Sequence, residues 1–192
     1  GMCDDIRLGV SLIFYLQNVI DYINLKKEKG NHSIIAPITL SGLSTSGKIL
    51  FGINKDEKQK ESKTLEAKKR NKLITEARNG DQEAMDSLTI DDIDLLATVS
   101  RRAKQEDIYS IVDTSFIPYG SESDNYSIVG TIVDVKLVQN ELTKEYIYDL
   151  LIESNDLTYD VCINKIDLLG EPQVGRRFKG NVWMQGFINF SE

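Results

Sequence analysis

Apolar and polar residues alternate along the first part of the chain, and the period then changes. The alternation predicts a strand with one buried face over residues 5–16. Apolar residues then recur at the i, i+3, i+4, i+7 spacing of a helix, which predicts a helix over residues 19–29. Asn18, with Asp21 three residues later, fits an N-terminal cap, and Gly30 fits the helix end.

The next alternating stretch contains a segment typical of a turn. Ser44-Thr45-Ser46-Gly47 separates two apolar stretches, and alternation resumes after it. This arrangement predicts a β-hairpin with strands over 34–43 and 48–53.

The middle of the chain has the pattern of helices. Residues 55–63 are charged and have no apolar period, as in a linker or a solvated helix start. We expect three helices between residues 57 and 105. The first ends at Asn79-Gly80, Asp81 caps the second, and Thr89 caps the third.

From residue 108 onward the pattern is again that of short strands. The predicted strands cover 107–117, 126–138, 145–154, 157–164 and 181–189. Short strands separated by turn signals at this spacing predict a small β-barrel or sandwich. Residues 165–169 fit the short helix that an OB-fold (oligonucleotide/oligosaccharide-binding) barrel carries between its third and fourth strands.

These elements predict an α+β protein in three parts. Residues 1–53 form a strand-helix-hairpin segment, and residues 54–105 form a charged helical connector. Residues 106–192 form a five-stranded antiparallel β-barrel or sandwich domain, which we expect to be OB-like.

Charge is distributed unevenly along the 192 residues. The net charge of the chain is −7, and residues 106–192 alone carry 15 acidic and 6 basic residues. Non-specific nucleic-acid binding needs a cationic surface, so the acidic C-terminal half argues against it. The middle segment is dense in charge but nearly neutral, as is typical of a solvated helix.

Composition excludes several classes of protein. The chain has no uninterrupted apolar stretch long enough to span a membrane and no signal-peptide pattern at its start, so we expect a cytoplasmic protein. Its cysteines, Cys3 and Cys162, are too few for a disulfide scaffold or a four-cysteine zinc site. With His32 as the one histidine, we expect no metal site and no cofactor.

Two short motifs resemble parts of a GTP-binding site. Residues 42–48 fit G-x-x-x-x-G-K, a phosphate-binding loop, but Ile49 follows where magnesium binding needs Ser or Thr. Asn164-Lys165-Ile166-Asp167 resembles the guanine-recognition sequence N-K-x-D, and no D-x-x-G motif lies between the two. The nucleotide-binding candidates are therefore Lys48, Asn164 and Asp167. The alternative, which we favour, is a hairpin turn and a polar strand end.

A basic segment near the C-terminus contains aromatic residues. Cations interleaved with aromatic side chains can bind phosphates and stack on bases. The nucleic-acid-binding candidates are Arg176, Arg177, Phe178, Lys179 and Trp183. In the favoured alternative, the cations neutralise nearby acids and the aromatic residues pack in the core.

No residue set is convincing as a catalytic centre. Asp160, Asp167 and Glu171 could supply a general acid and base, but a chain with 30 acidic residues contains such a trio by chance. Cys162 lies at an apolar strand position and is expected to be a buried hydrophobe. We assign no catalytic residue, and the sequence favours a non-enzyme without deciding the matter.

The chain resembles an uncharacterised family of Gram-positive bacterial proteins known only as a domain of unknown function. The resemblance covers the whole chain, and its most distinctive part is the tail. The residues that carry it are 3–18, Leu40-Ser41-Gly42-Leu43-Ser44, Ala77-Arg78-Asn79-Gly80-Asp81, Val161-Cys162-Ile163-Asn164-Lys165, Asp167-Leu168-Leu169-Gly170-Glu171-Pro172, Val174-Gly175-Arg176-Arg177-Phe178-Lys179-Gly180 and Trp183-Met184-Gln185-Gly186. Members of that family are longer, so the resemblance implies a C-terminal portion, and it implies no known activity, ligand or site residue.

Two functions remain open at this point. The first is a non-catalytic binding or scaffolding module that acts through macromolecular contacts, with strand edges available to a partner. Its partner is a protein or a preceding part of a longer chain, rather than nucleic acid or a membrane. The alternative is a nucleotide- or oligonucleotide-binding protein that uses the candidates named above. The oligomeric state is left open.

Overall fold

The computed structural model describes residues 1–5, 10–29, 36–53, 68–70, 72–77, 79–102, 109, 112–120 and 123–190. The chain divides into two compact units. The barrel unit comprises Gly1–Cys3, Ser11–Gly52 and Thr114–Glu192, and the helical unit comprises Asp4–Val10 and Ile53–Asp113. Each unit is described by itself.

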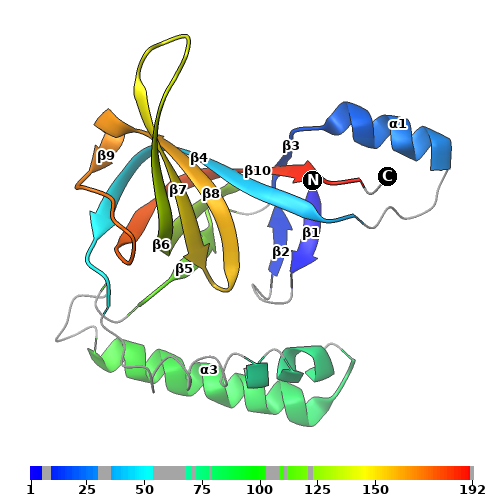
Figure 1. Cartoon of the computed structure of the whole chain (residues 1–192). Helices are drawn as coiled ribbons and strands as arrows, with labels where there is room; N and C mark the ends of the chain where they lie inside the picture. The colour runs from blue at the N-terminus through cyan, green and yellow to red at the C-terminus, as the bar shows by residue number, and fades with distance from the viewer. Residues whose placement is uncertain are drawn as a thin grey trace. The chain divides into compact units, whose positions relative to one another are not determined.

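Five strands of the barrel unit pair in a closed ring (Figure 1). Around the ring, β10 pairs with β4, β4 with β8, β8 with β7, β7 with β6, and β6 again with β10. The strands are β4 (Ile38–Leu50), β6 (Asn125–Gln139), β7 (Tyr146–Ser154), β8 (Leu157–Asn164) and β10 (Arg177–Ile188). The β4–β8 pair is parallel, and the other four pairs are antiparallel.

Short strands extend this sheet. Strand β5 (Ser115–Pro118) pairs with β6, β3 (Tyr15–Leu16) runs parallel to β10, and β9 (Leu168–Leu169) runs parallel to β4. Two more strands, β1 (Met2–Asp5) and β2 (Val10–Ile13), form a separate two-stranded sheet near the N-terminus.

The predicted α+β class with a five-stranded barrel is confirmed, and two details are wrong. The barrel is mixed rather than antiparallel, because β4 enters the ring between β10 and β8 and runs parallel to β8. The fifth barrel strand is β4, whereas the predicted strand 107–117 overlaps, in its described residues, the short strand β5 outside the ring. When the ring strands are counted from β6, β8 is the third, and the short helix η1 (Lys165–Asp167) follows it, as in an OB barrel. Strand β4 comes earlier in the chain but takes the place of the fifth strand in the ring.

The predicted hairpin around residues 44–47 is also wrong. These residues lie in the middle of the single strand β4. A Cβ atom at Gly42 would overlap the side chain of Val182, and one at Gly47 would overlap the ring of Phe178. The glycines therefore make room for barrel packing and do not form a turn. Ser44 Oγ donates a hydrogen bond to the carbonyl oxygen of Asn181 (2.8 Å), where the β10–β4 register shifts.

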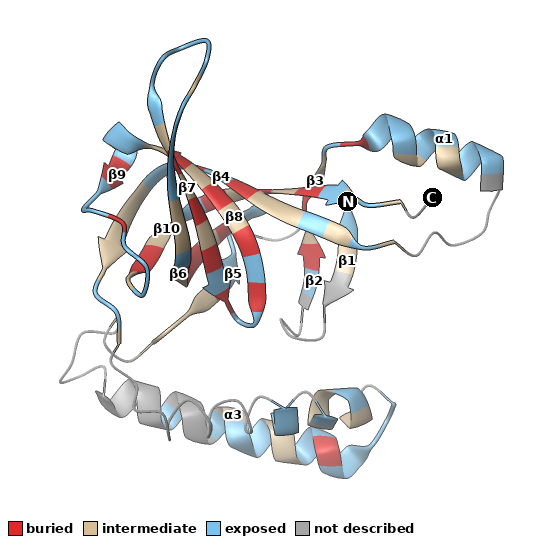
Figure 2. Ribbon diagram, in the orientation of Figure 1, coloured by how far each residue is buried: buried red, intermediate tan, exposed pale blue. Residues whose placement is uncertain are grey.

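Apolar side chains fill the interior of the barrel. They alternate along each strand with outward-facing residues, which gives every strand one buried side (Figure 2). The largest fully buried side chains of the ring strands are Tyr126, Tyr159, Phe178, Ile128, Ile132, Leu150, Ile152, Ile163, Met184, Val161 and Val182. At one end the Tyr126 hydroxyl accepts a hydrogen bond from Ile13 N (2.8 Å) and donates one to Ile13 O (2.9 Å), which ties β2 to the core.

Helix α1 (Val19–Lys29) has the predicted bounds, but Asn18 does not cap it as expected. Its side-chain amide donates to Ile188 O (2.9 Å), and its side-chain oxygen accepts from Ile188 N (3.0 Å). Asn18 thus acts as a further peptide group in the β3–β10 ladder, which also includes the bond from Gln17 N to Gly186 O (2.9 Å). The predicted strand 5–16 is β2 and β3, with Asp5 in β1, and residues 6–9 lie outside the described residues.

The helical unit contains one long helix where two short ones were predicted. Residues 68–70 and 72–77 are helical, and α3 (Gln82–Arg102) begins after Gly80, with the Asp81 carboxylate accepting from Ala84 N (3.1 Å). Thr89 does not cap a third helix, because its hydroxyl donates to the carbonyl oxygen of Met85 within α3 (2.9 Å). The predicted linker 55–63 lies outside the described residues. No helix in the described part of the chain has the length and apolarity needed to cross a membrane.

Candidate docking surface

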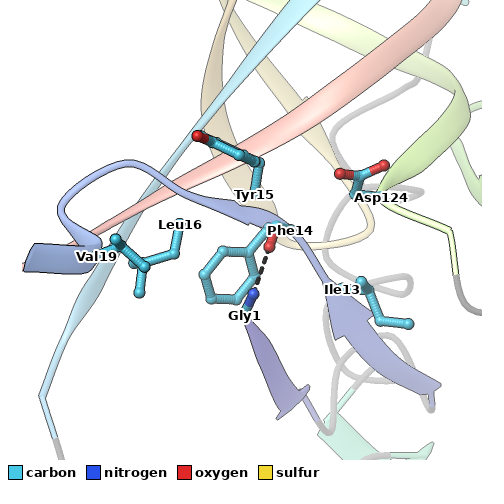
Figure 3. Close-up of a pocket in the computed structure, with 7 residues that line it drawn as sticks. All are labelled: Gly1, Ile13, Phe14, Tyr15, Leu16, Val19 and Asp124. Atoms are coloured by element: carbon cyan, nitrogen blue, oxygen red, sulfur yellow. Dashed lines mark hydrogen bonds between the residues drawn. The ribbon is translucent and has the colours of Figure 1, made fainter. Parts of the chain in front are cut away.

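A shallow depression of about 470 Å³ lies where strand β3 leads into helix α1 (Figure 3). Its lining is mostly apolar, and Asp124 is the one charged side chain in it. The lining residues are Gly1, Ile13, Phe14, Tyr15, Leu16, Val19 and Asp124. Phe14 is buried because its ring packs against Gly186, where any larger residue would clash with it. The Phe14 ring therefore belongs both to the lining of the depression and to the packed interior.

Tyr15, which lines this depression, belongs to an aromatic pair. The rings of Tyr15 and Trp183 are 5.3 Å apart at an angle of 53°. Trp183 Nε1 donates a hydrogen bond to Asp124 Oδ2 (2.9 Å), and the backbone of Asp124 accepts from Met184 N (2.8 Å). The Asp124 carboxylate therefore holds the indole in position. Tyr15 is 53 % exposed and contributes to the surface.

Helix α1 presents its apolar side to solvent. Val19, Ile20 and Ile23 are 45 %, 70 % and 44 % exposed. Among the α1 residues whose burial is described, none is buried (Figure 2). A helix with apolar residues at this spacing normally covers them against a core. We call these three residues the α1 stripe, and Val19 joins it to the depression.

The outward side of the barrel continues from the same aromatic pair. Paired residues on neighbouring strands project from the same face of a sheet. Trp183 on β10 is opposite Leu43 on β4, Leu43 is opposite Cys162 on β8, and Cys162 is opposite Asp149 on β7. We call these four residues, with Asp160 on β8, the outer face. It is apolar at Trp183 and Leu43 and acidic at Asp149 and Asp160.

The acidic end of the outer face perturbs its own titrating groups. Burial raises the pKa of the Asp160 carboxyl, and the charge of Asp149 raises it further, while Lys136 opposes the shift. Burial and the same two carboxylates raise the pKa of the Cys162 thiol. A thiol in this environment stays protonated at neutral pH and is a weak nucleophile. The prediction that Cys162 is a buried hydrophobe is wrong, because its side chain is half-buried on the outward side of the barrel, opposite Asp149.

The three predicted nucleotide-binding residues come from one end of the barrel. Lys48 lies within β4 opposite Leu169 of β9, Asn164 ends β8, and Asp167 ends η1. Asn164 Oδ1 accepts a hydrogen bond from Ile166 N (3.2 Å), so it caps η1. A phosphate-binding loop leads from a strand into a helix, whereas the backbone before Lys48 is an extended strand. Nucleotide binding by these three residues stays a prediction, and the phosphate-binding loop that would support it is not formed at Lys48.

The predicted nucleic-acid-binding residues do not share one surface. Phe178 is fully buried in the barrel core, and Arg177 is 4 % exposed, with Nε donating to Phe51 O (3.0 Å). Arg176 Nη1 donates to Glu171 O (3.0 Å). Trp183 is held by Asp124, and Lys179 lies opposite Lys48 in the β10–β4 pair. Their binding to nucleic acid stays a prediction, and only part of the set reaches solvent.

No arrangement for general acid–base chemistry is evident among the carboxylates singled out. Asp160 lies on β8 four residues before Asn164, which is about 13 Å along a strand and places it far from η1 and Asp167. Glu171 accepts a hydrogen bond from the Tyr148 hydroxyl (3.3 Å). Within the described ranges, no group of three His, Cys, Asp or Glu side chains is placed to hold a metal ion.

The α1 stripe and the depression were not predicted as a site from the sequence. The periodicity at Val19, Ile20 and Ile23 correctly indicated a helix, and such a pattern is normally explained by core packing. Nothing in a periodic pattern tells whether the surface that covers it belongs to the same chain. The lysines that follow the stripe, Lys26 and Lys27, were the available signal of a solvent-facing helix.

Comparison with known proteins gives a family and no activity. No curated protein and no solved structure matches the chain significantly. The family model described as a domain of unknown function, E. rectale gene description (DUF3881), matches residues 1–186. The chain therefore belongs to this family.

Proposed function

We propose that the chain is a non-catalytic binding module that holds another protein on the α1 stripe and the adjoining depression. The observation that carries this proposal is the exposure of Val19, Ile20 and Ile23 on a helix that buries none of its described side chains. Exposed apolar side chains gathered beside an apolar depression are typical of protein–protein contacts.

The chemistry of the depression favours a protein over a small molecule. Small-molecule sites usually enclose their ligand and present several convergent polar groups. Here the one charged side chain of the lining, Asp124, already accepts hydrogen bonds from Trp183 Nε1 and from Asn125 Nδ2 (3.1 Å). The aromatic pair beside it supplies the large, rigid contact area that is common in the centre of protein interfaces.

Nucleic-acid binding is the weaker alternative. The predicted stacking residue Phe178 is in the barrel core, and stacking on a base would require the core to open. The outer face next to Trp183 ends in the carboxylates of Asp149 and Asp160, which repel phosphates.

A photo-reactive amino acid placed at Ile20 tests the proposal. In cells that naturally produce the chain, irradiation should give one dominant covalent adduct that is identified by mass spectrometry. The matched control is the same amino acid at Leu142, which is 93 % exposed in the β6–β7 turn and outside the docking surface. Absence of an adduct from position 20, or the same adducts from both positions, would contradict the proposal.

A further inference from the structure

We infer that the partner is a second copy of this chain, with α1 of each protomer docked across the outer face of the other. This inference rests on the proposed function, because it names the partner of the same surface. It concerns residues of the barrel unit alone.

Apolar and charged groups follow one another in a matching order along the α1 stripe and across the outer face, and their charges are opposite. Along α1, the apolar residues Val19, Ile20 and Ile23 are followed by the exposed lysines Lys26 and Lys27. Across the barrel, the apolar residues Trp183 and Leu43 are followed by Asp160 and Asp149. When the apolar parts of the two surfaces are in contact, the lysines of one copy lie against the carboxylates of the other.

The dimensions of the two surfaces agree. Eight residues of α-helix separate Val19 from Lys27, a rise of about 12 Å. Three strand spacings separate Trp183 on β10 from Asp149 on β7, a distance of about 14 Å. A helix lying across these strands can therefore reach both ends of the outer face at once. The long side chain of lysine covers the remaining difference.

A cation supplied by a second copy would stabilise the charged outer face. Asp149 and Asp160 lie on adjacent strands, and the charge of Asp149 disfavours ionisation of Asp160. Within the protomer, Lys136 offsets this effect, but its amine also lies 3.8 Å from Asp134 Oδ2. A lysine supplied by the partner would relieve the repulsion. Leu43, which is 45 % exposed, would lose contact with water at the same time.

The two contacts of the dimer form one continuous interface. Tyr15 lines the depression next to Val19 and also contacts Trp183 of the outer face. In a dimer with two-fold symmetry, the α1 stripe of each copy meets the outer face of the other, so both surfaces are covered in both copies. Such an arrangement closes on itself and does not continue into a filament.

Charge exchange between two variants tests this contact directly. Variant A carries Lys26→Glu and Lys27→Glu, and variant B carries Asp149→Lys and Asp160→Lys. Sedimentation equilibrium of the whole chain should give a dimer for the unaltered protein and monomers for A and for B, with dimerisation weakened on the order of 100-fold, because like charges then face each other across the interface. An equimolar mixture of A and B should recover the dimer, because every α1 then faces an outer face of opposite charge.

Controls separate a loss of contact from a loss of folding. Lys68→Glu with Lys69→Glu reverses two exposed lysines in the helical unit and should leave the dimer intact. Leu43→Glu offers a second way to break the contact if variant B unfolds. Each variant is checked by thermal melting before sedimentation.

The outcomes distinguish this inference from the proposed function. A monomeric unaltered chain up to millimolar concentration, or an A and B mixture that stays monomeric, overturns the inference. If the Ile20 photo-adduct then contains a different protein, the binding module stands and its partner is that protein. If the adduct has twice the mass of the chain, the second copy is its partner.

Discussion

Strand β8 and helix α1 both carry a regular apolar pattern, yet one pattern is buried and the other is exposed. In β8, Leu157, Tyr159, Val161 and Ile163 are all at most 3 % exposed. In α1, the residues of the stripe are 44–70 % exposed. The difference lies in the neighbours, since β8 pairs with both β4 and β7 and faces a closed barrel, while α1 follows a two-residue edge strand. A periodic pattern thus determines the element and leaves its partner open.

The largest expected effect is the loss of a core side chain from the barrel. Phe178→Ala should lower the free energy of unfolding by about 3–5 kcal/mol, because it removes a fully buried ring that packs against Gly47 and Gly180. Urea unfolding of both variants measures this. Phe187→Ala on the same strand is the matched control, and at 43 % exposure it should cost less than about 1 kcal/mol. Equal losses for the two would mean that the barrel interior is not the core.

The second effect concerns the hydroxyl that joins β2 to the barrel. Tyr126→Phe leaves the amide and carbonyl of Ile13 without their partner, and we expect a loss of about 1–3 kcal/mol in unfolding free energy. Burial raises the pKa of this hydroxyl, which keeps it protonated and able to donate at neutral pH. Tyr146→Phe, at an exposed position of β7, should have no measurable effect in the same urea titration. If Tyr126→Phe is equally silent, β2 is not held by this contact.

The barrel strands show how much of the fold could be predicted from the sequence. Strands β6, β7 and β8 agree with the predicted ranges within a residue or so, because each has one buried side and ends at a recognisable turn. Strand β4 could not be predicted in the same way. Its glycines imitate turn signals, while their role is to admit Val182 and Phe178 from β10, which is distant in sequence. Local patterns do not contain such long-range packing.

The candidate site shows the complementary limit. The sequence singled out Trp183 as a base-stacking residue, but its partners, Tyr15 and Asp124, come from segments that the chain brings together only on folding. Phe178 and Arg177 have the composition of a nucleic-acid surface and are buried. Residue type predicts what a side chain is able to do, and burial decides whether it meets a ligand.

A smaller effect comes from charge on the outer face. The pKa of Asp160 is raised in the folded protein, so its ionisation costs stability at pH values above that folded pKa. Asp160→Asn should therefore stabilise the protein slightly at pH 7. The advantage should disappear below the unfolded pKa, near pH 3, where the carboxyl is protonated in both states. Thermal melting at both pH values, at a concentration low enough to keep the chain monomeric, measures the difference. A destabilised variant at pH 7 would mean that the Asp160 charge is satisfied within the protomer.

The smallest expected effect is on the α1 stripe, and it is the one that decides the comparison between β8 and α1. Ile20→Ala should change the unfolding free energy of the monomer by less than about 0.5 kcal/mol, because the side chain is 70 % exposed and alanine favours helix. Ile152→Ala in the barrel, by contrast, should cost about 2–5 kcal/mol. Both are measured by urea unfolding at a concentration low enough to keep the chain monomeric. A loss above about 2 kcal/mol for Ile20→Ala would show that the stripe packs inside its own protomer, and α1 would then be a core helix like any other. A silent substitution that nevertheless weakens the dimer would show that the apolar pattern of α1 serves a second molecule.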